Sequence, residues 1–105
     1  MLRWNHLGET EILLAALNKW GIDAQINMCI EEMAELTQAL NKYRRGKWSR
    51  ERVVEELADV DIALRQMIIV FGQGFIEKRE QKLQRLAKKV GVKATGSKVK
   101  EAEVD

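Results

Sequence analysis

The chain of 105 residues is long enough for one domain and too short for two domains with separate cores. Its formal charge is +2, from 18 Lys and Arg against 16 Asp and Glu, so the average field favours neither nucleic acid nor a membrane surface. Apolar residues make up 46% of the chain, as in ordinary globular proteins, and the lack of proline allows long helices.

The cysteine count and the hydropathy of the sequence indicate the cellular compartment in which the protein is expected. The single cysteine, Cys29, has no partner for an internal disulfide, and its apolar neighbours favour a buried thiol over a reactive one. No apolar run approaches the roughly 20 residues that cross a bilayer, and the N-terminus lacks the basic-then-apolar order of a signal peptide. We therefore expect a soluble cytoplasmic protein.

Two helices are predicted in the first half of the chain. The first covers about residues 10–20, where Gly21 is placed to end it, and its apolar face comprises Ile12, Leu13, Ala16, Leu17 and Trp20. The second is predicted to begin at a cap on Asp23 and to run about six turns, until Arg44, Arg45 and Gly46 stop it. Its apolar stripe comprises Ile26, Ile30, Met33, Leu36 or Thr37, and Leu40.

Two further helices are predicted in the second half. Ser49 can cap the third, which continues until Gly72 and Gly74, and its apolar series comprises Val53, Leu57, Val60, Leu64, Met67 or Ile68, and Phe71. The fourth covers about residues 75–90 and has one narrow apolar face. Gly91 ends it.

Four helices with short links favour an all-α fold, an antiparallel four-helix bundle in which the second and third helices pair. We expect one domain over residues 1–91 and a polar, disordered tail over residues 92–105. From Ile62 to Phe71 the third helix is apolar around much of its circumference. This surface predicts that a homodimer or a dimer of dimers completes the bundle.

Acidic residues are concentrated on the second and third predicted helices. The second contains Glu-x-x-Glu at Glu32 and Glu35, and the third contains Glu-x-x-Asp at Glu56 and Asp59. Residues three apart on a helix point to the same side, so each helix offers a pair of carboxylates. Like charges at this spacing repel, and apolar neighbours make ionisation still costlier. A divalent cation would remove both penalties.

The four carboxylates therefore predict a magnesium site, in which Mn²⁺ could substitute. Mg²⁺ prefers hard oxygen ligands and keeps water or phosphate in its other positions, as a cluster without His or Cys allows. The alternative is that these acids form the solvated faces of two exposed helices. A ferritin-like di-iron site would need two Glu-x-x-His pairs, and the only histidine, His6, lies elsewhere.

The acidic pattern resembles that of the all-α nucleotide pyrophosphohydrolases of the MazG type, which is Glu-Glu-x-x-Glu, a gap, and Glu-x-x-Asp. Here it stands as Glu31-Glu32-Met33-Ala34-Glu35, a gap of 20 residues, and Glu56-Leu57-Ala58-Asp59. Residues 20–25 and 58–60 add to the likeness, which covers about residues 10–90.

The resemblance implies Mg²⁺-dependent hydrolysis of a ribo- or deoxynucleoside triphosphate between the α and β phosphates, giving the monophosphate and pyrophosphate in the housecleaning of nucleotide pools. It makes Glu32, Glu35, Glu56 and Asp59 the metal ligands. Glu31 would be a further ligand or the base that orients the attacking water, and Glu35 would also count among the catalytic residues. The family includes enzymes for phosphoribosyl-ATP, dUTP and dCTP, and a general or deoxynucleotide-preferring triphosphatase is our expectation.

Substrate-binding residues are expected outside the acidic cluster. Lys78, Lys82 and Arg85 follow one another at i, i+4 and i+7, so they can line a groove for phosphates, and a solvated basic face is the alternative. Trp20 and Gln25 are expected to stack on the base and to form hydrogen bonds with the base or sugar. An indole on an apolar face more often belongs to a core, so this alternative stays open for Trp20.

Two other functions fit parts of the sequence. A non-catalytic helical interaction module would dock through the third helix and show no dependence on metal. Nucleic-acid binding through the basic residues 78–100 is disfavoured, because Glu77 and Glu80 lie on the same face and the aromatic residues that stack on single strands are absent there. Neither would need the paired carboxylates.

Overall fold

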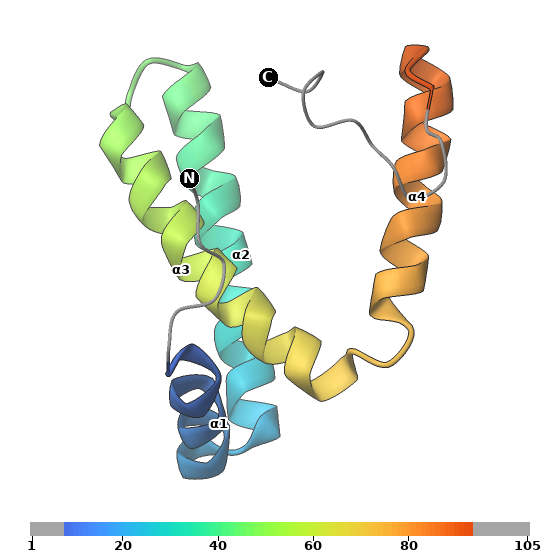
Figure 1. Ribbon diagram of the computed structural model, residues 1–105. Coiled ribbons are helices and arrows are strands. Elements are labelled where there is room, and N and C mark those ends of the chain that lie inside the picture. The colour runs from blue at the N-terminus through green and yellow to red at the C-terminus, as the bar shows by residue number, and fades with distance from the viewer. Residues whose placement is uncertain (1–7, 94–105) are drawn as a thin grey trace. The chain divides into compact units, whose positions relative to one another are not determined.

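The computed structural model describes residues 8–93, and within this range every regular element is a helix (Figure 1). The helices are α1 (Glu9–Trp20), α2 (Ile22–Arg44), α3 (Arg50–Phe71) and α4 (Phe75–Val90). The predicted all-α class and the four predicted helices are confirmed. None of the helices within the described range has both the length and the apolar character that crossing a membrane requires.

Gly21 separates α1 from α2. Its φ of 90° is accessible to glycine at no steric cost, and its N–H donates to the Leu17 carbonyl at 2.8 Å, which closes the last turn of α1. The Gly21 carbonyl in turn accepts the N–H of Gln25 at 3.1 Å. Gly21 thus ends one helix and begins the next.

The predicted cap at Asp23 is wrong. Gly21 occupies the N-cap position of α2 without any side-chain bond, so the helix begins at Ile22 and Asp23 lies inside its first turn. A carboxylate there still interacts favourably with the helix dipole. Asp23 does lie near the start of α2, but the turn at Gly21 places the first helical residue at Ile22, before Asp23.

The link between α2 and α3 is a short turn over residues 45–49. The N–H of Lys47 donates to the Lys42 carbonyl at 2.8 Å, and Gly46 takes a φ of 74°. At the start of α3, the N–H of Arg52 donates to Ser49 Oγ at 3.3 Å. Ser49 is therefore the N-cap of α3, as its sequence context predicts.

One compact unit ends at Phe71. Within it, α2 and α3 lie side by side as an antiparallel pair joined by the short turn (Figure 1). The shorter helix α1 packs against both. The buried side chains between the three helices are few, and several are small: Leu13, Gln25, Cys29, Ala39, Val60, Ala63 and Gln66. The predicted pairing of the second and third helices is confirmed.

The second compact unit begins at Gly72 and contains α4. Gly74 and Gly91 flank this helix with φ of 84° and 80°, and the N–H of Gly91 donates to the Lys88 carbonyl at 3.2 Å, so the predicted ends are confirmed. All four helices are present, whereas their assembly into one bundle and one domain over residues 1–91 stays a prediction. Residues 94–105 of the predicted tail lie outside the described residues.

Candidate metal centre

Three carboxylates meet where α2 packs on α3. Glu32 and Glu35 from α2 and Glu56 from α3 each place one carboxylate oxygen within 4.8 Å of the other two. Two of them are half-buried and Glu35 is exposed. The structure therefore brings together residues from both halves of the predicted acidic pattern.

Helix periodicity explains why these acids meet. Glu32 follows buried Cys29 by three residues and precedes Ala39, which is 0% exposed, by seven. On α3, Glu56 precedes buried Val60 and Ala63 by four and seven residues. Positions at these spacings share one side of a helix. Glu32 and Glu56 therefore lie on the sides through which their helices pack, and each is half-buried.

Two carboxylate atoms at this site have no hydrogen-bond partner among residues 8–93. They are Oε1 of Glu32 and Oε1 of Glu56, and both are buried. Buried polar atoms in native proteins are generally paired, so two orphaned acceptors beside a third carboxylate mark a place that a cation can fill. The donor set is all hard oxygen, which suits Mg²⁺ or Mn²⁺.

The electrostatics of the site agree with this geometry. Burial raises the pKa of Glu32 above its ordinary value, and the charges of Asp59, Glu35 and Glu56 raise it further. Burial also raises the pKa of Glu56, the charges of Glu35 and Asp59 add to the increase, and the Arg52 guanidinium opposes it. Metal-free protein thus holds these two carboxyl groups in surroundings that disfavour their ionised forms.

The other two predicted acids are not among these three carboxylates. Asp59 is exposed on α3 and is not one of the three carboxylates within 4.8 Å of one another, although its charge acts on both Glu32 and Glu56. Glu31 is exposed on α2, next to Glu32 in the chain. Cys29 is buried, as predicted, and its thiol has a raised pKa because of burial and the charge of Glu32.

The predicted substrate-binding residues lie in different surroundings. Gln25 is buried and donates a hydrogen bond to Gln66, while Trp20 is 55% exposed at the end of α1. Lys78, Lys82 and Arg85 are exposed on α4 in the second unit. Arg85 lines a surface hollow together with Gln81, Gln84 and Lys88.

Comparison with models of known protein families, with curated proteins and with solved structures finds no match to this chain.

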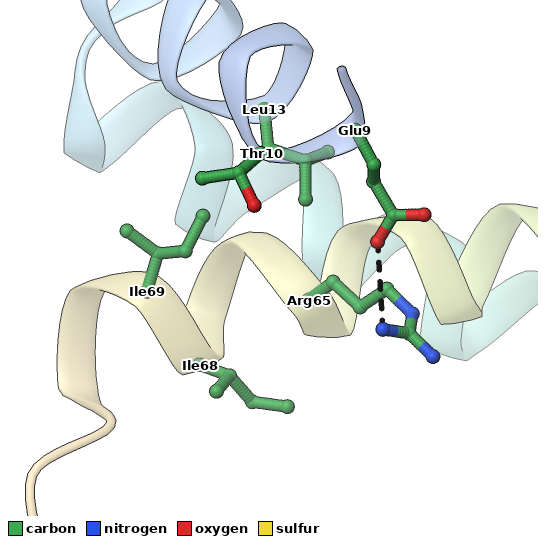
Figure 2. Close-up of a pocket in the computed structure, with 6 residues that line it drawn as sticks. All are labelled: Glu9, Thr10, Leu13, Arg65, Ile68 and Ile69. Atoms are coloured by element: carbon green, nitrogen blue, oxygen red, sulfur yellow. Dashed lines mark hydrogen bonds and ion pairs between the residues drawn. The ribbon is translucent and has the colours of Figure 1, made fainter. Parts of the chain in front are cut away.

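A second surface hollow, of about 210 Å³, lies between α1 and α3 and is lined by Glu9, Thr10, Leu13, Arg65, Ile68 and Ile69 (Figure 2). Arg65 extends from α3 toward α1, where its Nη1 lies 3.4 Å from Oε2 of Glu9. Its Nε also donates to Oδ2 of Asp61 at 3.0 Å. This ion-pair network ties α1 to α3.

Sequence reasoning missed a cluster of two cations and an indole at the turn between α2 and α3. The Arg52 guanidinium carbon lies 3.8 Å from the centre of the Trp48 ring, and Lys42 Nζ lies 4.9 Å from it. The four-residue spacing of Trp48 and Arg52 was the available signal, because a turn at a helix start can bring such residues together. Lys42 comes from the other helix and carried no such signal.

Proposed function

We propose that the chain is a Mg²⁺-dependent nucleoside triphosphate pyrophosphohydrolase, which cleaves between the α and β phosphates to give a monophosphate and pyrophosphate. The observation that carries the proposal is the meeting of Glu32, Glu35 and Glu56 where α2 packs against α3, with two buried oxygens that have no hydrogen-bond partner among residues 8–93. The arrangement fits a cation site and matches the spacing of the acidic pattern described above.

In this proposal Glu32, Glu35, Glu56 and Asp59 hold the metal. A bound divalent cation supplies charge neutralisation on the substrate phosphates and activation of water. The half-buried Glu32 and Glu56 provide rigid oxygen ligands because each is anchored in the helix-packing stripe. The exposed carboxylates of Glu35 and Glu31 are the candidates for orienting the attacking water and accepting its proton.

The active form is proposed to be a homodimer or a dimer of dimers. Three apolar side chains of α3 lie seven residues apart on one line and are well exposed in the single chain: Leu57 at 50%, Leu64 at 42% and Phe71 at 64%. A seven-residue apolar repeat is the pattern by which helices pack against one another. A second copy of the chain would cover this seam, which we define as Leu57, Leu64 and Phe71.

The deciding experiment is a pyrophosphate-release assay over ribo- and deoxynucleoside triphosphates, with Mg²⁺, with Mn²⁺ and with chelator. We expect pyrophosphate only when a metal is present, and its loss in folded Glu32→Gln and Glu56→Gln variants. Glu55→Gln is the matched control, because Glu55 is an exposed neighbour of Glu56 outside the cluster. Release of phosphate with a diphosphate product would reject the assigned bond, and full activity in the two cluster variants would reject the assigned ligands.

The competing proposal is a non-catalytic interaction module, and the exposed seam on α3 is the feature that favours it. A module of this kind would bind a helical partner whether or not Mg²⁺ is present. Calorimetry with Mg²⁺ and Mn²⁺ separates the two, because the enzyme requires a cation to bind at the carboxylates. Absence of heat for both ions, with a nucleotide analogue present, would favour the interaction module.

A further inference from the structure

The turn between α2 and α3 is the most basic short stretch of the chain. From residue 42 to residue 52 its cations are Lys42, Arg44, Arg45, Lys47, Arg50 and Arg52, with Glu51 the one acid among them. Most of these side chains are exposed. Two of them, the half-buried Lys42 and the exposed Arg52, lie over the half-buried indole of Trp48, at 4.9 and 3.8 Å from the ring centre.

The backbone of the turn positions this indole. The N–H of Trp48 donates to the Lys42 carbonyl at 3.4 Å, and the next residue, Ser49, caps α3. Trp48 therefore lies in the link that follows α2 and precedes α3. A guanidinium stacked on a ring uses its face for the contact, which leaves the N–H donors at its edges available for another group.

Neither cation is neutralised by an ion pair within residues 8–93. The carboxylate contacts within 4.0 Å in this range belong to Arg65, whereas Lys42 and Arg52 have none. Arg52 lies four residues before Glu56, on the same side of α3 and about 6 Å from it along the axis. Lys42 lies seven residues after Glu35 on α2, about 10.5 Å along that axis. Both cations thus lie beyond the acidic cluster, toward the turn.

We infer that Lys42 and Arg52, positioned by Trp48, bind the terminal phosphates of the triphosphate, which is the pyrophosphate group that leaves. The inference rests on the proposed function for the identity of the substrate. Guanidinium and ammonium groups form charge-assisted hydrogen bonds with phosphate oxygens, and Arg presents two donors side by side. Because two cations already contact the Trp48 ring, the proposal puts the nucleoside end away from this turn.

In the proposed reaction, negative charge increases on the phosphate group that these two cations would contact. Water oxygen forms a bond to the α phosphorus, the bond from that phosphorus to the bridging oxygen breaks, and the electron pair stays on pyrophosphate. The water proton passes to the carboxylate base. Lys42 and Arg52 therefore contact the group whose negative charge increases in the transition state, and such contacts raise the rate as well as the affinity.

The test compares Arg52→Gln and Lys42→Gln with Arg50→Gln, which removes the same charge from an exposed residue of α3 that is not stacked on Trp48. Calorimetry with inorganic tripolyphosphate in the presence of Mg²⁺ measures binding without turnover. We expect Kd to rise about tenfold or more in each of the first two variants, as for loss of a hydrogen bond to a charged group, and less than twofold in the control. Affinity for a nucleoside monophosphate should not change, because it lacks the terminal phosphates.

Each outcome supports or overturns the inference. If Arg52→Gln binds tripolyphosphate as well as Arg50→Gln does, the contacts of Lys42 and Arg52 with Trp48 only stabilise the turn, and the inference is wrong. Failure of the parent protein to bind tripolyphosphate would overturn the inference as well. If no nucleoside triphosphate is hydrolysed but tripolyphosphate binding depends on Arg52, the proposed reaction fails and the anion site stands. Circular dichroism and the melting temperature establish that each variant is folded.

Discussion

Gln25 and Gln66 join α2 to α3 in the interior of the first compact unit, where Nε2 of Gln25 donates to Oε1 of Gln66 at 2.6 Å. The two residues are only 3% and 5% exposed. Each amide would be buried without a partner if the other were removed, and such a group costs about 1–3 kcal/mol. The pair therefore fixes which part of α2 lies against which part of α3, the two helices that contribute the carboxylates.

A double-mutant cycle tests this pair. Gln25→Met alone should lower the free energy of unfolding by about 1–3 kcal/mol, because it leaves the Gln66 amide buried and unpaired. Gln25→Met with Gln66→Met should restore most of the loss, since apolar groups of similar shape replace both partners. Urea denaturation provides the measurement, and Gln38→Met, at an exposed position of α2, is the control.

The same double variant tests the substrate-binding role predicted for Gln25. In the structure the side chain is buried and bonded to Gln66, so we expect KM for the best nucleoside triphosphate to be unchanged within about twofold in the folded double variant. A KM raised tenfold or more, with stability restored, would instead support direct contact between Gln25 and the substrate.

Glu32→Gln should stabilise the metal-free protein at pH 8 and abolish its response to Mg²⁺. Glutamine has nearly the same shape and removes a negative charge that burial and three neighbouring carboxylates disfavour. Thermal denaturation with and without Mg²⁺ measures both effects. Glu55→Gln should change neither, and an Mg²⁺-dependent rise in melting temperature that survives in Glu32→Gln would remove Glu32 from the ligand set.

Stability of the metal-free protein should fall as pH rises above the ordinary glutamate range. The pKa of Glu32 and of Glu56 is above 4.5 in the folded protein, so the folded state binds more protons than the unfolded chain in the window that begins near 4.5 and extends upward through the raised values. The free energy of unfolding from urea titrations should therefore decrease across this window. Saturating Mg²⁺ should oppose the decrease, and Glu32→Gln with Glu56→Gln should flatten it.

Leu64→Glu should dissociate the proposed oligomer. Leu64 lies in the middle of the seam, so a carboxylate there would be buried without a partner at the interface, and we expect the dimer Kd to rise at least a hundredfold. Sedimentation velocity over a concentration series gives the measurement. Ile62→Glu, an equally apolar and exposed site on another side of α3, should remain dimeric, and a monomeric parent protein at high concentration would refute the proposal.

Loss of the N-cap of α3 should lower the stability of the protein modestly. Ser49→Ala removes the oxygen that accepts the N–H of Arg52, and we expect about 1 kcal/mol less stability by urea denaturation. Ser49→Asp should preserve the bond. Equal stability of the alanine and aspartate variants would mean that water replaces the cap without loss.

Local features of the sequence determined the helices. Gly21, Gly74 and Gly91 separate or end them because glycine accepts a positive φ, and Ser49 begins α3 because its hydroxyl accepts a free backbone N–H. The three-residue spacing of Glu32 and Glu35 also predicts a shared side of α2 without knowledge of the rest of the chain. These inferences need only residues within one or two helical turns.

Tertiary packing decided which acids meet and which polar groups are buried. Gln25 and Gln66 are 41 residues apart, and no local pattern shows that they are partners. The close approach of Glu56 to Glu32, the position of Asp59 outside the three-carboxylate group and the stacking of Lys42 on Trp48 likewise depend on how α2 lies against α3. Periodicity predicts which residues of a helix share a side, but the packed side of α2 differs from the predicted apolar stripe, since Ile30 and Met33 are exposed whereas Gln25 and Cys29 are buried. The axial register between the helices depends on long-range contacts such as the hydrogen bond from Gln25 to Gln66.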